Sequence, residues 1–204
     1  MLIEILGEEL ELLPEKAIFW PSMELLFIAD IGWAFTKKTF IESGFNEIER
    51  IKAILSKRSV RRIILLGEVA PEGRSLDKEL LVKFNIWSQA LHCPFYIAFA
   101  RSSFIPIEEI KGYGVAAWAD PLIIPPFAFS NDPIENDKYF TFSGHIHPHV
   151  VLKKGKERLS FPCFQIKQRL AILPSFSEDA VPQPISWTSD EKIYAIDGGL
   201  IISV

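Results

Sequence analysis

The sequence predicts an α/β fold, with one domain over residues 1–204 in which two β-sheets stack on each other. A length of 204 residues is typical of a single α/β domain. In the first half, short apolar runs alternate with helical patterns, which is typical of a mainly parallel sheet covered by helices. In the second half, short strand-like segments are separated by tight turns, which favours antiparallel hairpins.

The first half contains five expected elements in the order strand, helix, strand, helix, strand. They cover residues 23–30 (MELLFIAD), 46–57 (NEIERIKAILSK), 60–68 (VRRIILLGE), 76–92 and 94–100 (PFYIAFA). Asn46 is placed to cap the first helix. Asp30, Glu68 and the region around Arg101 follow the three strands. Because ligands gather at the carboxyl ends of strands in open parallel sheets, these positions are the first functional hint.

The second half is expected to form short strands within residues 139–145, 149–161, 163–174, 191–196 and 199–204. The segments KKGK (153–156) and IKQR (166–169) are plausible hairpin tips, and Gly198-Gly199 is another turn.

Composition favours a globular protein of the cytoplasm. Hydrophobic residues make up 49% of the chain and the mean hydropathy is +0.18, enough to bury a large core. No uncharged apolar run reaches the roughly 18 residues of a membrane span, and the acidic start lacks the pattern of a signal peptide. The two cysteines, Cys93 and Cys163, make a disulfide framework improbable and a reducing compartment the default. The net charge of −4 gives no overall attraction to nucleic acid.

Three of the four histidines, His145, His147 and His149, lie within FSGHIHPHV (142–150). Two neutral imidazoles separated by one residue at a strand end, as in His145 and His147, can approach a common centre and suit Zn, Fe or Mn. The alternative is a polar turn in which histidines happen to cluster. His149 follows a proline and is expected to support the site or to lie on the surface.

Asp30 and Glu68 end two consecutive strands, where a carboxylate serves either as a metal ligand or as a helix cap. Two carboxylates in equivalent positions, together with the later histidines, favour a metal. The expected arrangement places Asp30, Glu68 and His147 on one ion, with His145 supporting a second ion.

A basic hairpin follows the histidines. Lys153 and Lys154, together with Lys156 and Arg158, are candidates for contact with the phosphate backbone of a substrate. The alternative is that lysines at a hairpin tip only keep the edge soluble.

The order and flanks of these motifs resemble the calcineurin-like metallophosphoesterases, and most closely the ligase-associated DNA damage response endonuclease (PdeM) group. The matching stretches are LLPEKAIFWPSMELLFIADIGWA, RRIILLGE, GHIHPHVVL, RLSFPCFQI, LAILPSF and KIYAI, colinear over nearly the whole chain. The resemblance implies a metallophosphoesterase-type α/β sandwich: two stacked mixed β-sheets flanked by helices, with a cleft at the strand ends. It also implies a phosphodiester substrate, DNA by analogy, and ligase-associated repair proteins as partners.

Several family motifs are altered. Asp30-Ile31-Gly32 stands where the family has Asp-x-His, and Gly67-Glu68 stands where it has Gly-Asp. FARSS (99–103) replaces the Asn-His-Asp block, and the middle histidine falls near Ser130-Asn131-Asp132. Gly144-His145-Ile146-His147 and Asp30 are unchanged.

These departures imply a divalent metal (Mn, Fe or Zn) at fewer than two ions per chain. By resemblance, Asp30 and His147 are ligands, Glu68 takes the bridging position, and His145 and Asn131 belong to a weak second site. Arg101 and His145 are the catalytic candidates, although Arg101 also suits a surface position. Three functions remain: a weak metal-dependent phosphoesterase, a catalytically inactive binding or scaffold module, and a protein with a purely structural metal site.

Overall fold

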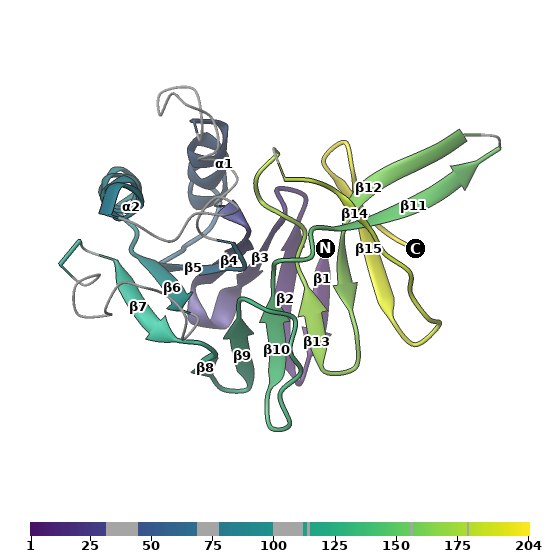
Figure 1. Cartoon of the computed structure of the whole chain (residues 1–204), viewed down its shortest axis with the longest axis horizontal. Helices are drawn as coiled ribbons and strands as arrows, with labels where there is room; N and C mark the ends of the chain where they lie inside the picture. Colours follow the sequence, from purple (N-terminus) through teal and green to yellow (C-terminus); the bar gives the residue numbers. More distant parts are fainter. Residues whose placement is uncertain (32–44, 69–77, 100–111, 114, 156, 179) are drawn as a thin grey trace.

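The computed structural model describes residues 1–31, 45–68, 78–99, 112–113, 115–155, 157–178 and 180–204. Within these ranges the chain forms two β-sheets that stack face to face, with helices beside the first sheet (Figure 1). The prediction of an α/β sandwich of two mixed sheets is confirmed.

The first sheet has seven strands in the described residues, arranged in chain order. They are β1 (Leu2–Ile5), β2 (Glu8–Leu13), β3 (Ala17–Trp20), β4 (Leu25–Ala29), β5 (Arg62–Leu66), β6 (Phe95–Phe99) and β7 (Ala116–Ala119). The strands from β1 to β4 pair antiparallel, with the 3-10 helix η1 (Pro21–Met23) between β3 and β4. The strands from β4 to β7 pair parallel, as the alternating pattern predicted. The N-terminal meander β1–β3 was not predicted.

The second sheet contains β8 (Leu122–Ile124), β9 (Phe127–Ser130), β10 (Phe140–Ser143), β11 (Pro148–Lys154), β12 (Glu157–Ile166), β13 (Leu170–Ile172), β14 (Gln183–Pro184), β15 (Lys192–Asp197) and β16 (Leu200–Ser203). The expected hairpins β11–β12, β12–β13 and β15–β16 are confirmed. The expectation of an antiparallel second half is wrong for β10, which pairs parallel with β13 and with β9, a strand that was not predicted. Parallel neighbours need a connection that returns the chain to the same end, and residues 131–139 provide it between β9 and β10.

The helices α1 (Phe45–Leu55) and α2 (Lys78–Leu91) cover the outer face of the first sheet (Figure 1). Ile51 and Ile54 of α1 pack there with Trp87 and Leu91 of α2. Among the described residues, the helices expected over the second sheet are not present. The helix α1 begins at Phe45, so Asn46 lies inside its first turn instead of capping it. Neither described helix is long and apolar enough to cross a bilayer.

Aromatic side chains fill the space between the two sheets. Phe142 of β10 is fully buried, with its ring centroid 4.8 Å from that of Phe27 in β4 and 5.0 Å from that of Phe127 in β9. Most of these rings meet at tilted or edge-to-face angles, the arrangement that aromatic pairs prefer. This packing fixes β4 against β10, the two strands whose ends carry Asp30 and the histidines.

The two cysteines are buried free thiols, in line with the expectation that they form no disulfide framework. Burial raises the pKa of Cys93 to about 11 and that of Cys163 to about 12. Both side chains therefore act as small apolar groups of the core, not as nucleophiles.

Phe142→Ala is expected to lower the free energy of unfolding by about 3–5 kcal/mol, because it removes a buried ring and leaves a cavity between the sheets. Urea denaturation followed by fluorescence measures this change. Ile123→Ala, at a side chain that is 37% exposed in β8, is the control and should change stability by less than about 0.5 kcal/mol. Equal losses in the two variants would contradict the role given to the aromatic layer.

Candidate functional site

Asp30 lies at the edge where the two sheets meet. It follows β4 directly and is fully buried. Its Oδ1 accepts the backbone N–H of Glu68, beyond β5, at 2.7 Å and that of His145, beyond β10, at 2.9 Å. Its Oδ2 lies 3.0 Å from the same His145 nitrogen. One carboxylate therefore connects the carboxyl ends of strands from both sheets, whereas the sequence predicted only that Asp30 and Glu68 follow two neighbouring strands.

Two glycines make room for this carboxylate. A Cβ added to Gly67 would lie 2.0 Å from Asp30 Oδ1 and 2.7 Å from the His145 nitrogen. A Cβ added to Gly144 would lie 2.9 Å from Asp30 Oδ2 and 3.0 Å from the Cα of Gly67. The two turns thus approach each other closely from opposite sheets, which only glycine permits at both positions.

The backbone is unusual at this edge. Asp30, His145 and His147 have φ values of 56°, 73° and 51°, in the left-handed region that L side chains rarely adopt. Each such residue costs of order 1 kcal/mol or more. Strain of this kind clusters at functional sites, where the surrounding structure compensates for it.

His147 is buried against Asp30. Its Nε2 lies 3.7 Å from Asp30 Oδ2, and its Nδ1 lies 3.2 Å from the carbonyl oxygen of Val181. Burial lowers the pKa of His147, but the Asp30 carboxylate, the Val181 carbonyl and Glu68 more than offset this effect, so the pKa is raised. An Nδ1–H donated to the carbonyl fixes the imidazole with Nε2 on the side of Asp30, as in histidines that bind metals.

Glu68 and His145 form a second acid–imidazole pair. Glu68 Oε1 lies 3.4 Å from His145 Nδ1. The His145 side chain is 49% exposed, whereas that of Glu68 is 20% exposed. The pair therefore lies at the solvent-facing rim of the site, and the Asp30–His147 pair lies beneath it.

The donor atoms suit a divalent ion, because carboxylate oxygens and imidazole nitrogens are ligands of Mn, Fe and Zn. In the conformation described for the resolved ranges, no three His, Cys, Asp or Glu side chains are arranged so that they could hold a metal. Asp30 faces His147, and Glu68 faces His145.

Two other predicted site residues are Asn131 and Arg101. Asn131 follows β9, whose last residue, Ser130, is in register with the last residue of β10, so Asn131 lies at the same sheet edge as His145. Its backbone N–H donates to Asp120 Oδ2 at 3.1 Å. Arg101 lies outside the described residues.

Lys153 and Lys154 lie near the tip of the β11–β12 hairpin. Because a strand rises about 3.3 Å per residue, Lys153 is roughly 20 Å from His147 along the chain. The hairpin therefore places these two lysines away from the acid–imidazole pairs.

The segment LAILPSF (170–176), one of the stretches that carry the resemblance, contacts Asp30 and the preceding residue through Ser175 and Phe176. Ser175 Oγ donates to the Asp30 carbonyl oxygen at 3.3 Å, and Phe176 N–H donates to the Ala29 carbonyl oxygen at 2.7 Å. The Arg50 guanidinium stacks 4.1 Å from the Phe176 ring centroid and contacts Glu178. Ser175 and Phe176 lie more than 140 positions after Asp30, and no periodicity in the sequence could have paired them.

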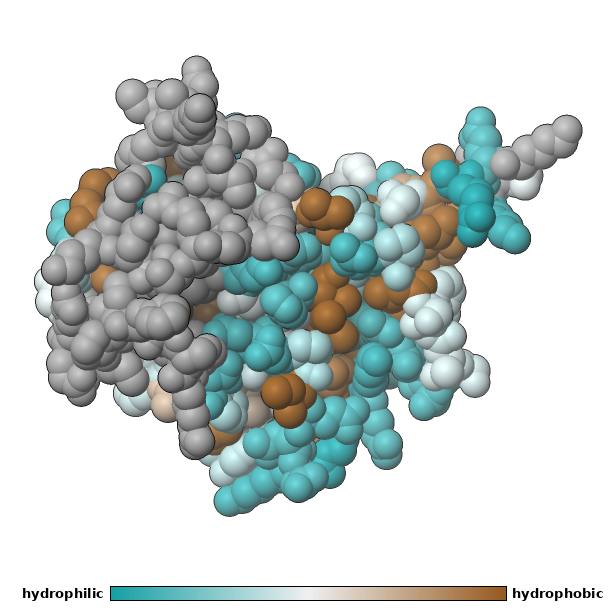
Figure 2. Space-filling view, in the orientation of Figure 1, coloured by the Kyte–Doolittle hydropathy of each residue, from teal (hydrophilic) through white to brown (hydrophobic). Residues whose placement is uncertain are grey.

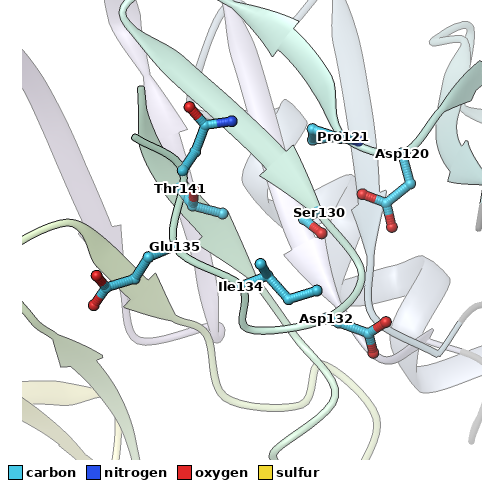
Figure 3. Close-up of a pocket in the computed structure, with 8 residues that line it drawn as sticks. Asp120, Pro121, Ser130, Asp132, Ile134, Glu135 and Thr141 are labelled. Carbon is cyan, nitrogen blue, oxygen red and sulfur yellow. The ribbon is translucent and has the colours of Figure 1, made fainter. Parts of the chain in front are cut away.

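A separate pocket of about 290 Å³ opens beside Asn131 on the outer face of the second sheet. Figure 3 shows Ser130, Thr141 and Asp120 around it, with Asp132 and Ile134 from the loop after β9. Its lining includes none of Asp30, Glu68, His145 and His147. The pocket is therefore separate from the Asp30–His147 and Glu68–His145 pairs.

The likeness to known proteins is structural. No protein-family model matches the chain, and no curated protein matches its sequence. Among solved structures, the crystal structure of Pseudomonas putida nuclease MPE matches with a TM-score of 0.80 at 23% identity, covering 100% of this chain and 99% of that one. The two proteins share a fold over their full lengths, which confirms the two-sheet α/β architecture.

Gly67→Ala is expected to destabilise the protein much more than Gly198→Ala. Both glycines have positive φ, 63° and 53°, so both variants carry the backbone cost of about 1 kcal/mol. Only at Gly67 does the new methyl displace the Asp30 carboxylate, because nothing lies within 4 Å at Gly198. Gly67→Ala should therefore lower the free energy of unfolding by at least about 1.5 kcal/mol more than Gly198→Ala does, because one hydrogen bond to a charged group typically contributes this much.

Urea denaturation measures both losses, and amide hydrogen exchange at Glu68 and His145 should accelerate in Gly67→Ala alone. If the two variants lose equal stability and exchange stays slow, Asp30 does not hold the two turns together.

Proposed function

We propose that the chain is a metal-dependent phosphoesterase of the metallophosphoesterase kind, with a single ion as its main cofactor. The observation that supports this most is the meeting of Asp30, Glu68, His145 and His147 at one edge, although they come from three strand ends and two sheets. Such a grouping of carboxylates and imidazoles is expected of a hydrolytic metal site.

Asp30, His147 and Glu68 are the proposed ligands. Asp30 Oδ2 and His147 Nε2 face each other at 3.7 Å, and Glu68 follows the glycine that borders Asp30. When bound there, a divalent ion would supply Lewis-acid chemistry toward a phosphodiester. Val181 keeps the His147 ring in place through its carbonyl, and Ser175 holds the Asp30 backbone.

His145 is the proposed proton donor to the leaving oxygen. Its side chain is half exposed at the rim, within reach of a bound substrate, and Glu68 Oε1 at 3.4 Å orients it. A positioned acid of this kind contributes typically 10²–10⁴-fold to the rate. Arg101 is proposed as a source of positive charge in the cleft. His145 and Asn131 would at most complete a weak second ion site.

The proposed substrate is a phosphodiester, and DNA is the favoured polymer. The support is the resemblance to DNA-repair-associated endonucleases and the fold shared with a protein named as a nuclease. Partnership with repair ligases and residence in the cytoplasm rest on the resemblance and on composition alone.

A second function is favoured by the hydrogen bonds of Asp30. Its carboxylate accepts two backbone N–H groups and joins the two sheets. These hydrogen bonds give Asp30 a structural role that does not depend on catalysis. The alternative is therefore a catalytically inactive binding or scaffold module.

The test is metal content by elemental mass spectrometry, with hydrolysis of a nitrophenyl phosphodiester in Mn²⁺ measured on the same protein. The expected content is about one ion per chain, with measurable hydrolysis. His147→Ala should remove the ion and lower the rate by roughly 100-fold or more, because it deletes a ligand. His92→Ala is the control: His92 is exposed at the end of α2, and its loss should change neither quantity.

Binding of one ion without hydrolysis would favour the inactive module, or a structural metal site. Absence of any bound ion would contradict the metal proposal altogether. A content near two ions would contradict the single-ion proposal and indicate that His145 and Asn131 complete a second site.

A further inference from the structure

The hairpin of β11 and β12 extends beyond the body of the protein (Figure 1). We call its outer part, residues 149–162, the arm. In the arm His149 pairs with Pro162, Val151 with Ser160, and Lys153 with Arg158. The space-filling view shows hydrophilic side chains gathered around its tip (Figure 2). An extension of this kind is not needed to close the core between the sheets.

The two faces of the arm differ in composition. Because side chains alternate along a strand, one face carries Val150 and Leu152, paired in register with Phe161 and Leu159. On this face Val150 is fully buried, and Leu152 and Phe161 pack with it against β15. The inner part of this face is thus occupied by the protein itself.

The opposite face, which we call the basic face, carries Lys153 directly across from Arg158. Next toward the body, Ser160 lies across from the half-buried Val151. The side chains of Lys153, Arg158 and Ser160 are exposed. Within the described residues neither Lys153 nor Arg158 forms an ion pair. Like charges directly opposite each other on a sheet are destabilising, so the pair is not explained by stability of the hairpin.

The basic face starts at the candidate site. His149 Nδ1 lies 3.2 Å from Ser160 Oγ, and His149 is only two residues after His147. The face therefore runs from the Asp30–His147 pair to the Lys153–Arg158 pair, over roughly 20 Å.

We propose that the basic face binds the phosphate backbone of a nucleic acid strand that passes through the candidate site. Lys153 and Arg158 contact phosphates, and Ser160 donates a hydrogen bond between them and the site. This inference rests on the proposed phosphodiester substrate and specifies which surface of the chain holds its backbone. Charge complementarity selects this occupant: the chain carries −4 overall, yet Lys153 and Arg158 are exposed here and form no ion pair with any described residue.

The test is fluorescence anisotropy of a labelled oligonucleotide across a series of salt concentrations, using the full chain with Lys153→Gln and Arg158→Gln combined. The slope of log K against log salt should fall by about 0.7–0.9 for each lost phosphate contact, and the Kd should rise by roughly tenfold.

The control combines Lys138→Gln and Lys192→Gln, the same loss of two charges. Lys138 precedes β10, and Lys192 is in register with Ile166 at the end of β12 away from the tip, so both lie far from the arm. This control should leave the slope and the Kd within about twofold of the original values. Equal changes in the two double variants, or no binding by the original chain, would overturn the proposal.

Two further measurements separate this inference from the proposed function. Hydrolysis of the nitrophenyl phosphodiester should be unchanged in the arm variant, whereas cleavage of an oligonucleotide should show a raised KM. Equilibrium binding needs no catalysis, so the arm is tested even if the protein proves inactive. Arm-dependent binding to phosphatidylserine vesicles, with none to the oligonucleotide, would replace the nucleic acid with a membrane surface and overturn the assignment.

Discussion

The hydrogen bonds accepted by the Asp30 carboxylate are the constraint on which the candidate site depends. A buried carboxylate is costly unless it is hydrogen-bonded, and the N–H groups of Glu68 and His145 meet that requirement. These two donors belong to different sheets. The bonds therefore stabilise the carboxylate and also fix how the ends of β4, β5 and β10 meet. Because Glu68 follows β5 and the histidines follow β10, these bonds position the side chains of the site.

Much of this edge could be predicted from the sequence. Apolar runs that stop at Asp30 and Glu68 indicate strand ends, and ends of parallel strands lie together. The GHIHPH segment was correctly expected at the end of a strand of the other sheet. The sequence could not predict which carboxylate faces which imidazole: Asp30 faces His147, and Glu68 faces His145. The expected set of three ligands on one ion depends on side-chain torsions, which periodicity does not encode.

The remaining differences have physical reasons. Glutamates interrupt the apolar residues of β1 (LIEI) and β2 (EELELL), and β3 (AIFW) has only four residues, so the meander lacks the longer apolar runs that marked β4 and β5, although its inward side chains, such as Leu10 and Leu12, are fully buried. The parallel pairing of β9, β10 and β13 depends on long connections, which local turn patterns cannot reveal. The Val181 carbonyl that orients His147 comes from a segment without any recognisable motif.

Asp30 stabilises the fold and is also a proposed metal ligand. Oδ1 accepts both backbone N–H groups, at 2.7 and 2.9 Å, whereas Oδ2 shares only the His145 N–H, at 3.0 Å, and faces His147 Nε2. A ligand role for Oδ2 therefore leaves the two shorter hydrogen bonds to Oδ1 in place. Asp30 by itself does not indicate catalysis, because the fold requires this carboxylate whether or not the protein is an enzyme. His147 is the better indication of a metal site, because its ring is buried, its Nδ1 is held by the Val181 carbonyl and its Nε2 faces Asp30 Oδ2.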